Sequence, residues 1–372
     1  MTGFKEAAKA LREAAPEIKV FAGLDGTVDE IIHIVEKRTG AHVEDYQRFE
    51  KIADFGEKIV QASGLSSNFE MVPVLVKIGG NGPIYVNALL ELGLRVTYCG
   101  SLGYPDIHPV FKSMADNPRC EIISRWQPSH TDAFEFQDGK IIMGKLRVFY
   151  DITWESFKEA MGGVHPIAKH LESSQLVGLL NWTMLPFMSR IWEGVLEEVL
   201  PLVNFDGKTE RPFIFFDLAD PAKRSLEDIK QALGLIARLN KSFRAVLGLN
   251  EKESRQIAAA LGVQNPENLE YKELAEAVYE RLDLHCVVIH PTTCAFAMTK
   301  DGYFHAEGPY CEKPVLTTGA GDNFNAGFCI GLLRGLDPGG ALKTGVAMSG
   351  FYVRKGRSAT LSELADFMDS IG

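Results

Sequence analysis

A glycine-rich turn followed by an aspartate, within the segment TTGAGDNFNAGF at residues 317–328, holds the residues best suited to chemistry. Gly319 and Gly321 let the chain turn and allow a ligand to approach the backbone. The free N–H groups at the start of the helix expected here attract anions. Asp322 stands at that start, where a carboxylate is useful if it accepts a proton from a hydroxyl. We therefore predict phosphoryl transfer to an alcohol, with Gly319, Ala320 and Gly321 as the anion hole and Asp322 as the base.

The same residues have a structural alternative, because Asp is a favoured first residue of helices and Gly is common in turns. The following helix shifts the balance. Ala326, Gly327 and Gly331 keep one of its faces small for close packing, while Phe324 and Phe328 supply a core face. This context favours the functional interpretation.

The segment TTGAGDNFNAGF resembles the C-terminal signature of the ribokinase-like family of carbohydrate and nucleoside kinases, also called the phosphofructokinase B type. The resemblance implies that Asp322 takes the proton of the acceptor hydroxyl and that the Gly-Ala-Gly amides hold the transferring phosphate. It also implies ATP as the donor and Mg²⁺ as the metal.

Apolar runs that alternate with helical patterns predict an α/β fold, a doubly wound and mainly parallel sheet flanked by helices. The runs expected to be buried strands are residues 18–24, 175–182, 211–220, 244–250 and 285–290. The resemblance adds a small β-sheet lid, expected from about 27–38, 72–78 and 119–148. A polar, helix-like insertion is expected at about 40–70, and residues 1–372 form one kinase domain with this lid.

Polar residues after the first strand and in a paired-glycine turn are the predicted substrate contacts. Ligands of parallel sheets gather where strands end. Asp29 is the better match to the sugar-binding aspartate of the family and Asp25 is the reserve, with solvated turn acids as the alternative. The turn beginning at Gly79 resembles the N-terminal signature of the family, although Ile84 stands where Asn is usual. The predicted set is Asp25, Asp29, Gly79, Gly80, Asn81 and Asn181, with Asp217 near the same cleft.

The motif Asn250-Glu251-Lys252-Glu253 follows a strand and has the NxxE form that the family uses for Mg²⁺ and phosphate. Asn250 and Glu253 are therefore predicted to hold Mg²⁺, through water, although N-x-x-E is also nearly a capping box. The other residues predicted to contact the nucleotide are Thr292, Thr318, Val346, Ser349 and Gly350.

Two departures from the family pattern concern the nucleotide and a monovalent cation. His290 stands where a Thr-x-Gly motif is expected, so nucleotide contacts should differ in detail. Leu316 replaces an acid that helps to bind a monovalent cation in many members. We expect weak or absent activation by K⁺, and a many-fold loss of initial rate on replacing K⁺ with a large organic cation would refute this.

Composition narrows the class of protein. The 372 residues are 46% hydrophobic and 24% charged, as in a soluble globular protein. A net charge of −10 disfavours nucleic acid as a partner, and no apolar stretch reaches the 18 residues of a membrane span. Six cysteines without a CxxC pair indicate reduced thiols and a cytoplasmic protein, and the histidines show no zinc spacing.

The favoured function is an ATP-dependent, Mg²⁺-requiring kinase that acts on a hydroxyl of a small sugar-like molecule. One alternative is a sugar- or nucleotide-binding regulator without catalysis, and another is a kinase that uses ADP as donor. A P-loop kinase is disfavoured because GxxxxGK[ST] does not occur. A homodimer through the lid is a further expectation from relatives.

Overall fold

The computed structural model describes residues 2–206, 208 and 210–372, and in these residues the main sheet has nine strands. Their order is β14-β13-β12-β11-β10-β9-β1-β5-β6. The pairs from β6 to β12 are parallel, and β13 and β14 are added antiparallel at one edge. The strands are β1 (Lys19–Leu24), β5 (Arg95–Gly100), β6 (Cys120–Ser124), β9 (Leu176–Leu179), β10 (Phe213–Asp217), β11 (Arg244–Leu249), β12 (Cys286–Ile289), β13 (Cys294–Thr299) and β14 (Gly302–Glu307).

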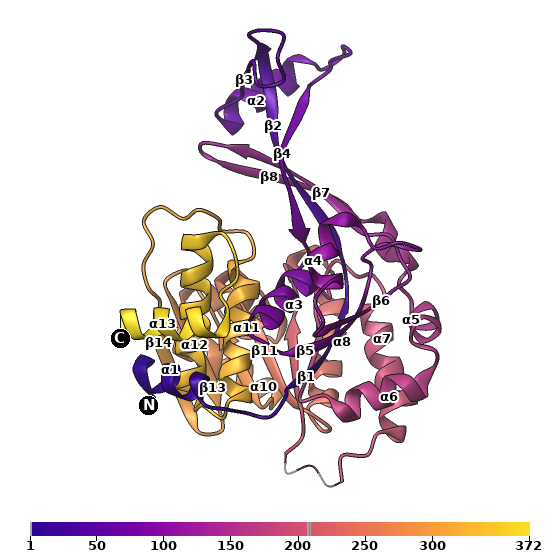
Figure 1. Cartoon of the computed structure of the whole chain (residues 1–372), viewed down its shortest axis with the longest axis vertical. Helices are drawn as coiled ribbons and strands as arrows, with labels where there is room; N and C mark the ends of the chain where they lie inside the picture. Colours follow the sequence, from indigo (N-terminus) through magenta and orange to yellow (C-terminus); the bar gives the residue numbers. More distant parts are fainter. Residues whose placement is uncertain (1, 207, 209) are drawn as a thin grey trace.

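Helices cover both faces of this sheet (Figure 1). One face packs against α5 (Trp154–Met161), α6 (Val164–Ser173), α7 (Met188–Gly194), α8 (Leu226–Leu239), α9 (Glu251–Ala260) and α10 (Tyr271–Leu282). The other packs against α1 (Phe4–Arg12), α3 (Asn81–Glu91), α4 (Lys112–Ala115), α11 (Ala320–Leu333), α12 (Pro338–Lys355) and α13 (Leu361–Ile371). Short helical turns are η1 (Pro109–Phe111), η2 (Leu146–Asp151), η3 (Val195–Val199), η4 (Leu200–Leu202), η5 (Pro221–Lys223) and η6 (Pro266–Asn268).

The apolar runs in the sequence have a direct structural reason. Strand β10, with the sequence FIFFD, is buried at every position, because a central parallel strand covered on both faces has no solvent side. Neighbouring residues of a strand serve opposite cores: Phe21 packs toward α5–α10, and Val20 toward α1, α3 and α11–α13. The predicted doubly wound, mainly parallel sheet is thus confirmed.

A second sheet of five strands projects from this core (Figure 1), and we call it the small sheet. The long strand β2 pairs antiparallel with β4, parallel with β7 and, at its far end, antiparallel with β3, while β8 pairs with β7. The five strands are β2 (Thr27–Arg38), β3 (Tyr46–Arg48), β4 (Met71–Gly79), β7 (Ser129–Phe136) and β8 (Gly139–Lys145).

The expected third segment of the lid, 119–148, divides between the two sheets. Strands β7 and β8 belong to the small sheet, but β6 pairs parallel with β5 at the edge of the main sheet. The physical reason is the helical connection formed by η1 and α4, which returns the chain to the same sheet in parallel.

The expected helical insertion at 40–70 contains one helix, α2 (Ile52–Gln61), and its first part is not helical. Residues 46–48 form β3, which pairs with β2. Phe49 and Phe55 are buried against β2 and β7, whereas Val43, which belongs to the same apolar spacing, is 66% exposed. The apolar spacing in this region therefore reflects a strand and a separate helix.

Within the described ranges, none of the helices combines the length and the apolar character that a membrane span needs.

Candidate active site

Polar side chains follow five neighbouring strands at one edge of the main sheet. Asp25 follows β1, Asn181 follows β9, Asp217 ends β10, Asn250 follows β11 and His290 follows β12. Parallel strands end at the same edge, so residues far apart in the sequence meet there. The chain order also reverses between β1 and β9, which makes this edge the switch point of the sheet.

Asp25 lies below the surface and holds in position the turn of residues 79–82, which we call the substrate-side loop. Its side chain has no exposed area, and its Oδ1 accepts hydrogen bonds from Gly82 N–H at 3.0 Å and from Tyr98 Oη at 3.4 Å. Its Oδ2 accepts one from Asn181 Nδ2 at 2.8 Å and would lie 2.5 Å from a side-chain carbon at Gly80. Burial raises the pKa of Asp25 to about 6, against these hydrogen bonds. Both oxygens of Asp25 thus have protein partners, and its role as a substrate contact stays a prediction.

A second buried carboxylate joins β10 to helix α11. The backbone N–H of Asn181 donates to Asp217 O at 3.0 Å, and Asp217 Oδ1 accepts from Ala219 N–H at 2.9 Å. Asp217 Oδ2 accepts from Asn325 Nδ2 at 3.0 Å, one helical turn beyond the start of α11. Burial, together with the charge of Glu253, raises the pKa of Asp217 to about 7. This carboxylate fixes the first turns of α11 against the sheet.

The glycine-rich turn begins α11 with amides that are available to a ligand. Gly319 has φ of 100° and immediately precedes the helix. The N–H of Ala320 donates to Thr317 O at 3.1 Å, so this amide, predicted for the anion hole, is used inside the turn. The N–H groups of Gly319 and Gly321 find no hydrogen-bond acceptor among the residues that the structure describes.

Asp322 lies where this turn meets the substrate-side loop. Its side chain is only 9% exposed, and burial, with the charges of Asp217 and Asp25, raises its pKa well above the ordinary value. A hydrogen bond with Asn81 and the charge of Lys77 oppose that rise. The structure thus brings together Asp322 and Asn81, two of the predicted site residues.

The small sheet carries an acid and two lysines toward this edge. Asp29 and Lys77 are partners in the register of β2 and β4, with 3.6 Å between Asp29 Oδ2 and Lys77 Nζ. A side-chain carbon at Gly79 would come within 2.1 Å of Asp29 Oδ1, so this position must stay small. Lys140 of β8 donates a hydrogen bond to Thr318 Oγ1, immediately before the glycine-rich turn.

The NxxE motif forms a complete capping box at the start of α9. Asn250 Oδ1 accepts from Glu253 N–H at 2.9 Å, and Glu253 Oε2 accepts from Asn250 N–H at 2.9 Å. Glu253 Oε1 accepts from Asp220 N–H at 3.0 Å. Burial raises the pKa of Glu253. The motif therefore does act as a helix cap. Each oxygen of the Glu253 carboxylate still has a lone pair for a further partner.

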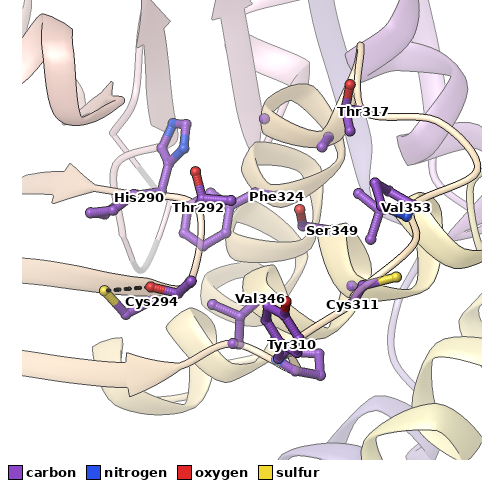
Figure 2. Close-up of a pocket in the computed structure, with 18 of the residues that line it drawn as sticks. His290, Thr292, Cys294, Tyr310, Cys311, Thr317, Phe324, Val346, Ser349 and Val353 are labelled. Atoms are coloured by element: carbon purple, nitrogen blue, oxygen red, sulfur yellow. Dashed lines mark hydrogen bonds between the residues drawn. The ribbon is translucent and has the colours of Figure 1, made fainter. Parts of the chain in front are cut away.

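A cavity of about 420 Å³ opens beside the glycine-rich turn. Figure 2 shows side chains from the ends of β12 and β13, from α11 and from α12 around it. Of the residues predicted to contact the nucleotide, Asn250, Thr292, Val346, Ser349 and Gly350 line it, together with Gly321. Thr318 and Glu253, predicted for the same site, lie outside its lining.

His290 forms part of the cavity wall. Its ring stacks on Phe324, with 4.7 Å between ring centroids, and lies 3.4 Å from where a side-chain carbon of Gly321 would be. Burial lowers the pKa of His290 to about 4, so the ring is neutral near pH 7.

Sequence reasoning missed two residues near the site. Lys77 could have been found, because a strand pairing between 27–34 and 71–79 makes it the partner of Asp29. Lys140 lies in a hairpin of ordinary appearance and is 178 residues from its partner Thr318, so no local pattern indicates it.

Comparisons with known proteins identify the family of this chain. A sequence model of the prokaryotic ketohexokinase family matches residues 2–371. A ketohexokinase from Haloferax volcanii is 27% identical over 368 residues, which cover 97% of this chain and 94% of that protein.

Solved structures share the fold. The ribokinase from Thermotoga maritima has a TM-score of 0.59 at 16% identity, covering 95% of this chain and 100% of its own. A candidate ribokinase II from E. coli, solved with ATP and Mg²⁺, has a TM-score of 0.61 at 14% identity, covering 95% and 99%. The chain therefore belongs to the prokaryotic ketohexokinase family, and it is a sugar kinase.

Proposed function

We propose that this protein transfers the γ-phosphoryl group of ATP to a hydroxyl of a ketohexose, as a kinase of the phosphofructokinase B type. The observation that carries the proposal is the position of Asp322: it stands at the head of α11 between the nucleotide-sized cavity and Asn81 of the substrate-side loop. The volume of about 420 Å³ is within the range of small-molecule sites. The ketose follows from the family and from the Haloferax volcanii relative.

In the proposed reaction the acceptor hydroxyl lies beside Asn81 and Asp322, beneath the small sheet, which acts as a lid. The hydroxyl oxygen forms a bond to the γ-phosphorus while its proton passes to Asp322. The bond from that phosphorus to the bridging oxygen breaks, and ADP leaves. The N–H groups of Gly319 and Gly321 point at the charge that develops on the phosphoryl oxygens. Stabilising this charge is usually the largest contribution to the rate of such a reaction.

Mg²⁺ would be held mainly through water and phosphate oxygens, because no group of three acids, histidines or cysteines in the described residues is placed to hold a metal ion directly. Asp217, Glu253 and Asp322 are buried acids with raised pKa values, and a divalent cation would offset the repulsion among them. Asn250 and Glu253 would hold it through water, and the ion would neutralise phosphate charge. We expect chelation of Mg²⁺ to abolish turnover.

The decisive experiment measures product release for a panel of ketohexoses, aldohexoses, nucleosides and sugar phosphates, each with Mg-ATP and with Mg-ADP. We expect turnover with a ketohexose and ATP. Turnover only with ADP would favour the alternative donor. Binding of sugar and nucleotide without any product would favour a regulator and contradict the proposal.

We also propose that two copies associate through the small sheet. Strand β4 leaves Val74, Leu75 and Val76 about half exposed, and β8 does the same with Ile142 and Met143. Apolar side chains in such number on one sheet favour burial against a partner. Light scattering should give twice the mass of the chain, and the double variant Ile142→Asp/Met143→Asp should give a monomer; a wild-type monomer at micromolar concentration refutes the proposal.

A cytoplasmic location is the last part of the proposal. All six cysteines are unpaired thiols, and three of them are buried, which suits a reducing compartment. Recovery of the protein in a membrane or exported fraction would refute it.

A further inference from the structure

The wall of the nucleotide cavity is short of positive charge. None of the residues that line it is Lys or Arg, and its one histidine, His290, is neutral near pH 7. The surrounding acids Asp322, Asp217 and Glu253 are buried. A triphosphate brings about four further negative charges, so phosphoryl transfer here needs a cation from outside the cavity wall in addition to a metal ion.

Most cations near this edge are already committed to acids. Lys77 faces Asp29 at 3.6 Å, within a largely buried pair. Lys252, beside the cavity, pairs with Asp220 at 2.9 Å. In each case, the charge of the ammonium group is balanced by a carboxylate of the protein.

Lys140 differs from them. Its ammonium donates to the neutral hydroxyl of Thr318, and among the described residues it has no carboxylate within 4 Å. Burial raises the pKa of Asp29, and the charges of Lys77 and Lys140 act against that rise, so Lys140 also acts on the substrate side. The ammonium therefore lies between Asp29 and the glycine-rich turn, one residue from Gly319.

We propose that Lys140, carried by β8 of the small sheet, is a catalytic residue that contacts the transferring phosphoryl group when the small sheet closes over bound substrates. The inference rests on the proposed kinase reaction and adds to it the cation that the cavity wall lacks. When a phosphoryl group occupies the glycine-rich turn, the ammonium exchanges its hydrogen bond to Thr318 Oγ1 for charged hydrogen bonds to phosphoryl oxygens. Charged hydrogen bonds are about twice as strong as neutral ones.

Lys140 keeps its own proton throughout. The acceptor oxygen forms its bond to phosphorus, Asp322 receives the acceptor proton and ADP departs, so the lysine stabilises charge without exchanging atoms. Closure places Lys140 at the phosphoryl group. Binding of the sugar beneath the small sheet would therefore also promote transfer of the phosphoryl group from ATP.

The test compares Lys140→Met and Lys140→Arg with Lys145→Met. Lys145 lies in the same strand, five residues away and thus on the opposite face, and pairs with Asp132 at 2.6 Å. For each variant, kcat and KM are measured with Mg-ATP and the best ketohexose, and affinities are measured for ADP and for an imido analogue of ATP that is not hydrolysed.

We expect Lys140→Met to lower kcat about 100-fold or more, the usual effect of removing one preorganised charge-stabilising donor. Its affinity for the imido analogue, measured with the ketohexose present, should fall about tenfold while its affinity for ADP is unchanged, since only the former has a γ-phosphate. Lys140→Arg should recover part of kcat, and Lys145→Met should match the wild type.

Two results would overturn the inference: a kcat of Lys140→Met within about threefold of the wild type, or equal losses of affinity for ADP and for the imido analogue. Failure of the proposed function is distinguishable from these, because then the wild type itself turns over no acceptor. A Lys140→Met protein that melts below the wild type and regains its full activity when stabilised by sugar would also count against a catalytic role.

Discussion

Each buried acid at the edge of the main sheet has a different partner, and these partners decide what it can do. Asp25 and Asp217 accept hydrogen bonds from protein amides and fix the loops and helices around the site. Asp322 is buried with Asn81 beside it, and in the proposed reaction it would receive the proton of the acceptor hydroxyl. Burial is the main cause of the raised pKa values of all three carboxylates, and the charges of Asp217 and Asp25 add to the rise at Asp322. In the proposed reaction, this would make Asp322 a stronger base than an exposed aspartate.

The raised pKa values predict how stability depends on pH. With the pKa of Asp25 near 6 and of Asp217 near 7 when folded, against 3.8 as the ordinary value, the native state holds more protons than the unfolded state between pH 4 and 7. The free energy of unfolding must therefore fall as pH rises through this range, by about 1.4 kcal/mol per pH unit for each extra proton.

Asp217→Asn should make that fall shallower, because it removes one of the two titrating groups. The amide can still be accommodated, since Asn325 Oδ1 is buried without a partner among the described residues and can accept from it if the Asn325 amide turns over. Urea unfolding at several pH values measures the slope, with the exposed Asp106→Asn as control. Equal slopes for Asp217→Asn and the wild type would show that Asp217 is charged throughout.

Gly319 should be needed for activity and not only for folding. A side-chain carbon there would lie 2.8 Å from Tyr352 Oη and 3.2 Å from Ile84 Cγ2, and would displace the turn that presents the amides. Gly335, at the other end of α11, also has positive φ, but open space surrounds it. We expect Gly319→Ala and Gly335→Ala to lose similar stability, about 1 kcal/mol each, from the left-handed backbone.

Only Gly319→Ala should lose activity, by about tenfold or more in kcat, as for a weakened charge-stabilising site. Melting temperatures and steady-state kinetics on both variants separate the two effects. Equal kinetics would mean that the exact path of this turn is unimportant for transfer.

What the sequence could predict about single residues came from local pattern. Asp322 and Gly319 lie in one short motif, and Asn81 follows a paired glycine, so each could be assigned from its neighbours. The burial of Asp25 could not, because it depends on Tyr98 and Asn181, which reach it from other strands.

At the scale of elements, degree of burial decided which predictions held. Strands of the main sheet that are buried on both faces have continuous apolar sequences and were recognised. Strand β6 is only half-buried at an edge, and its pattern looks like that of a strand in the small sheet. An edge strand therefore carries too little information to reveal which sheet it joins.

The small sheet is stabilised by its own apolar cluster. A mutation in this cluster should therefore affect the small sheet without destabilising the main sheet. Phe55 of α2 is 5% exposed and packs with Phe49, Phe134 and Phe136. Phe55→Ala should cost about 3 to 5 kcal/mol in this cluster. Because the main sheet has separate cores, we expect local loosening of the small sheet with a KM for the sugar raised about tenfold and an unchanged affinity for ADP.

Hydrogen exchange across residues 27–38 measures that loosening directly. Val60→Ala on the same helix is the control, since this side chain is 73% exposed. Unchanged exchange and KM in Phe55→Ala would show that the cluster does not support the sugar site.

At the scale of the whole molecule, the proposed reaction assigns different parts of phosphoryl transfer to the main sheet and to the small sheet. In the proposed reaction, the main sheet and α11 would supply the base, the anion-binding amides and the nucleotide cavity. The small sheet brings Asp29, Lys77 and Lys140 over that edge. In the proposed reaction, closure of the small sheet would add positive charge near the phosphate, and the acceptor hydroxyl would lie between the two sheets.

The most direct test of this account is the turnover of Asp322→Asn with Mg-ATP and a ketohexose, beside the exposed Asp116→Asn as control. The account predicts that Asp322→Asn binds ADP as the wild type does but loses about 100-fold or more in kcat, the scale of a positioned base. A kcat close to that of the wild type would contradict it.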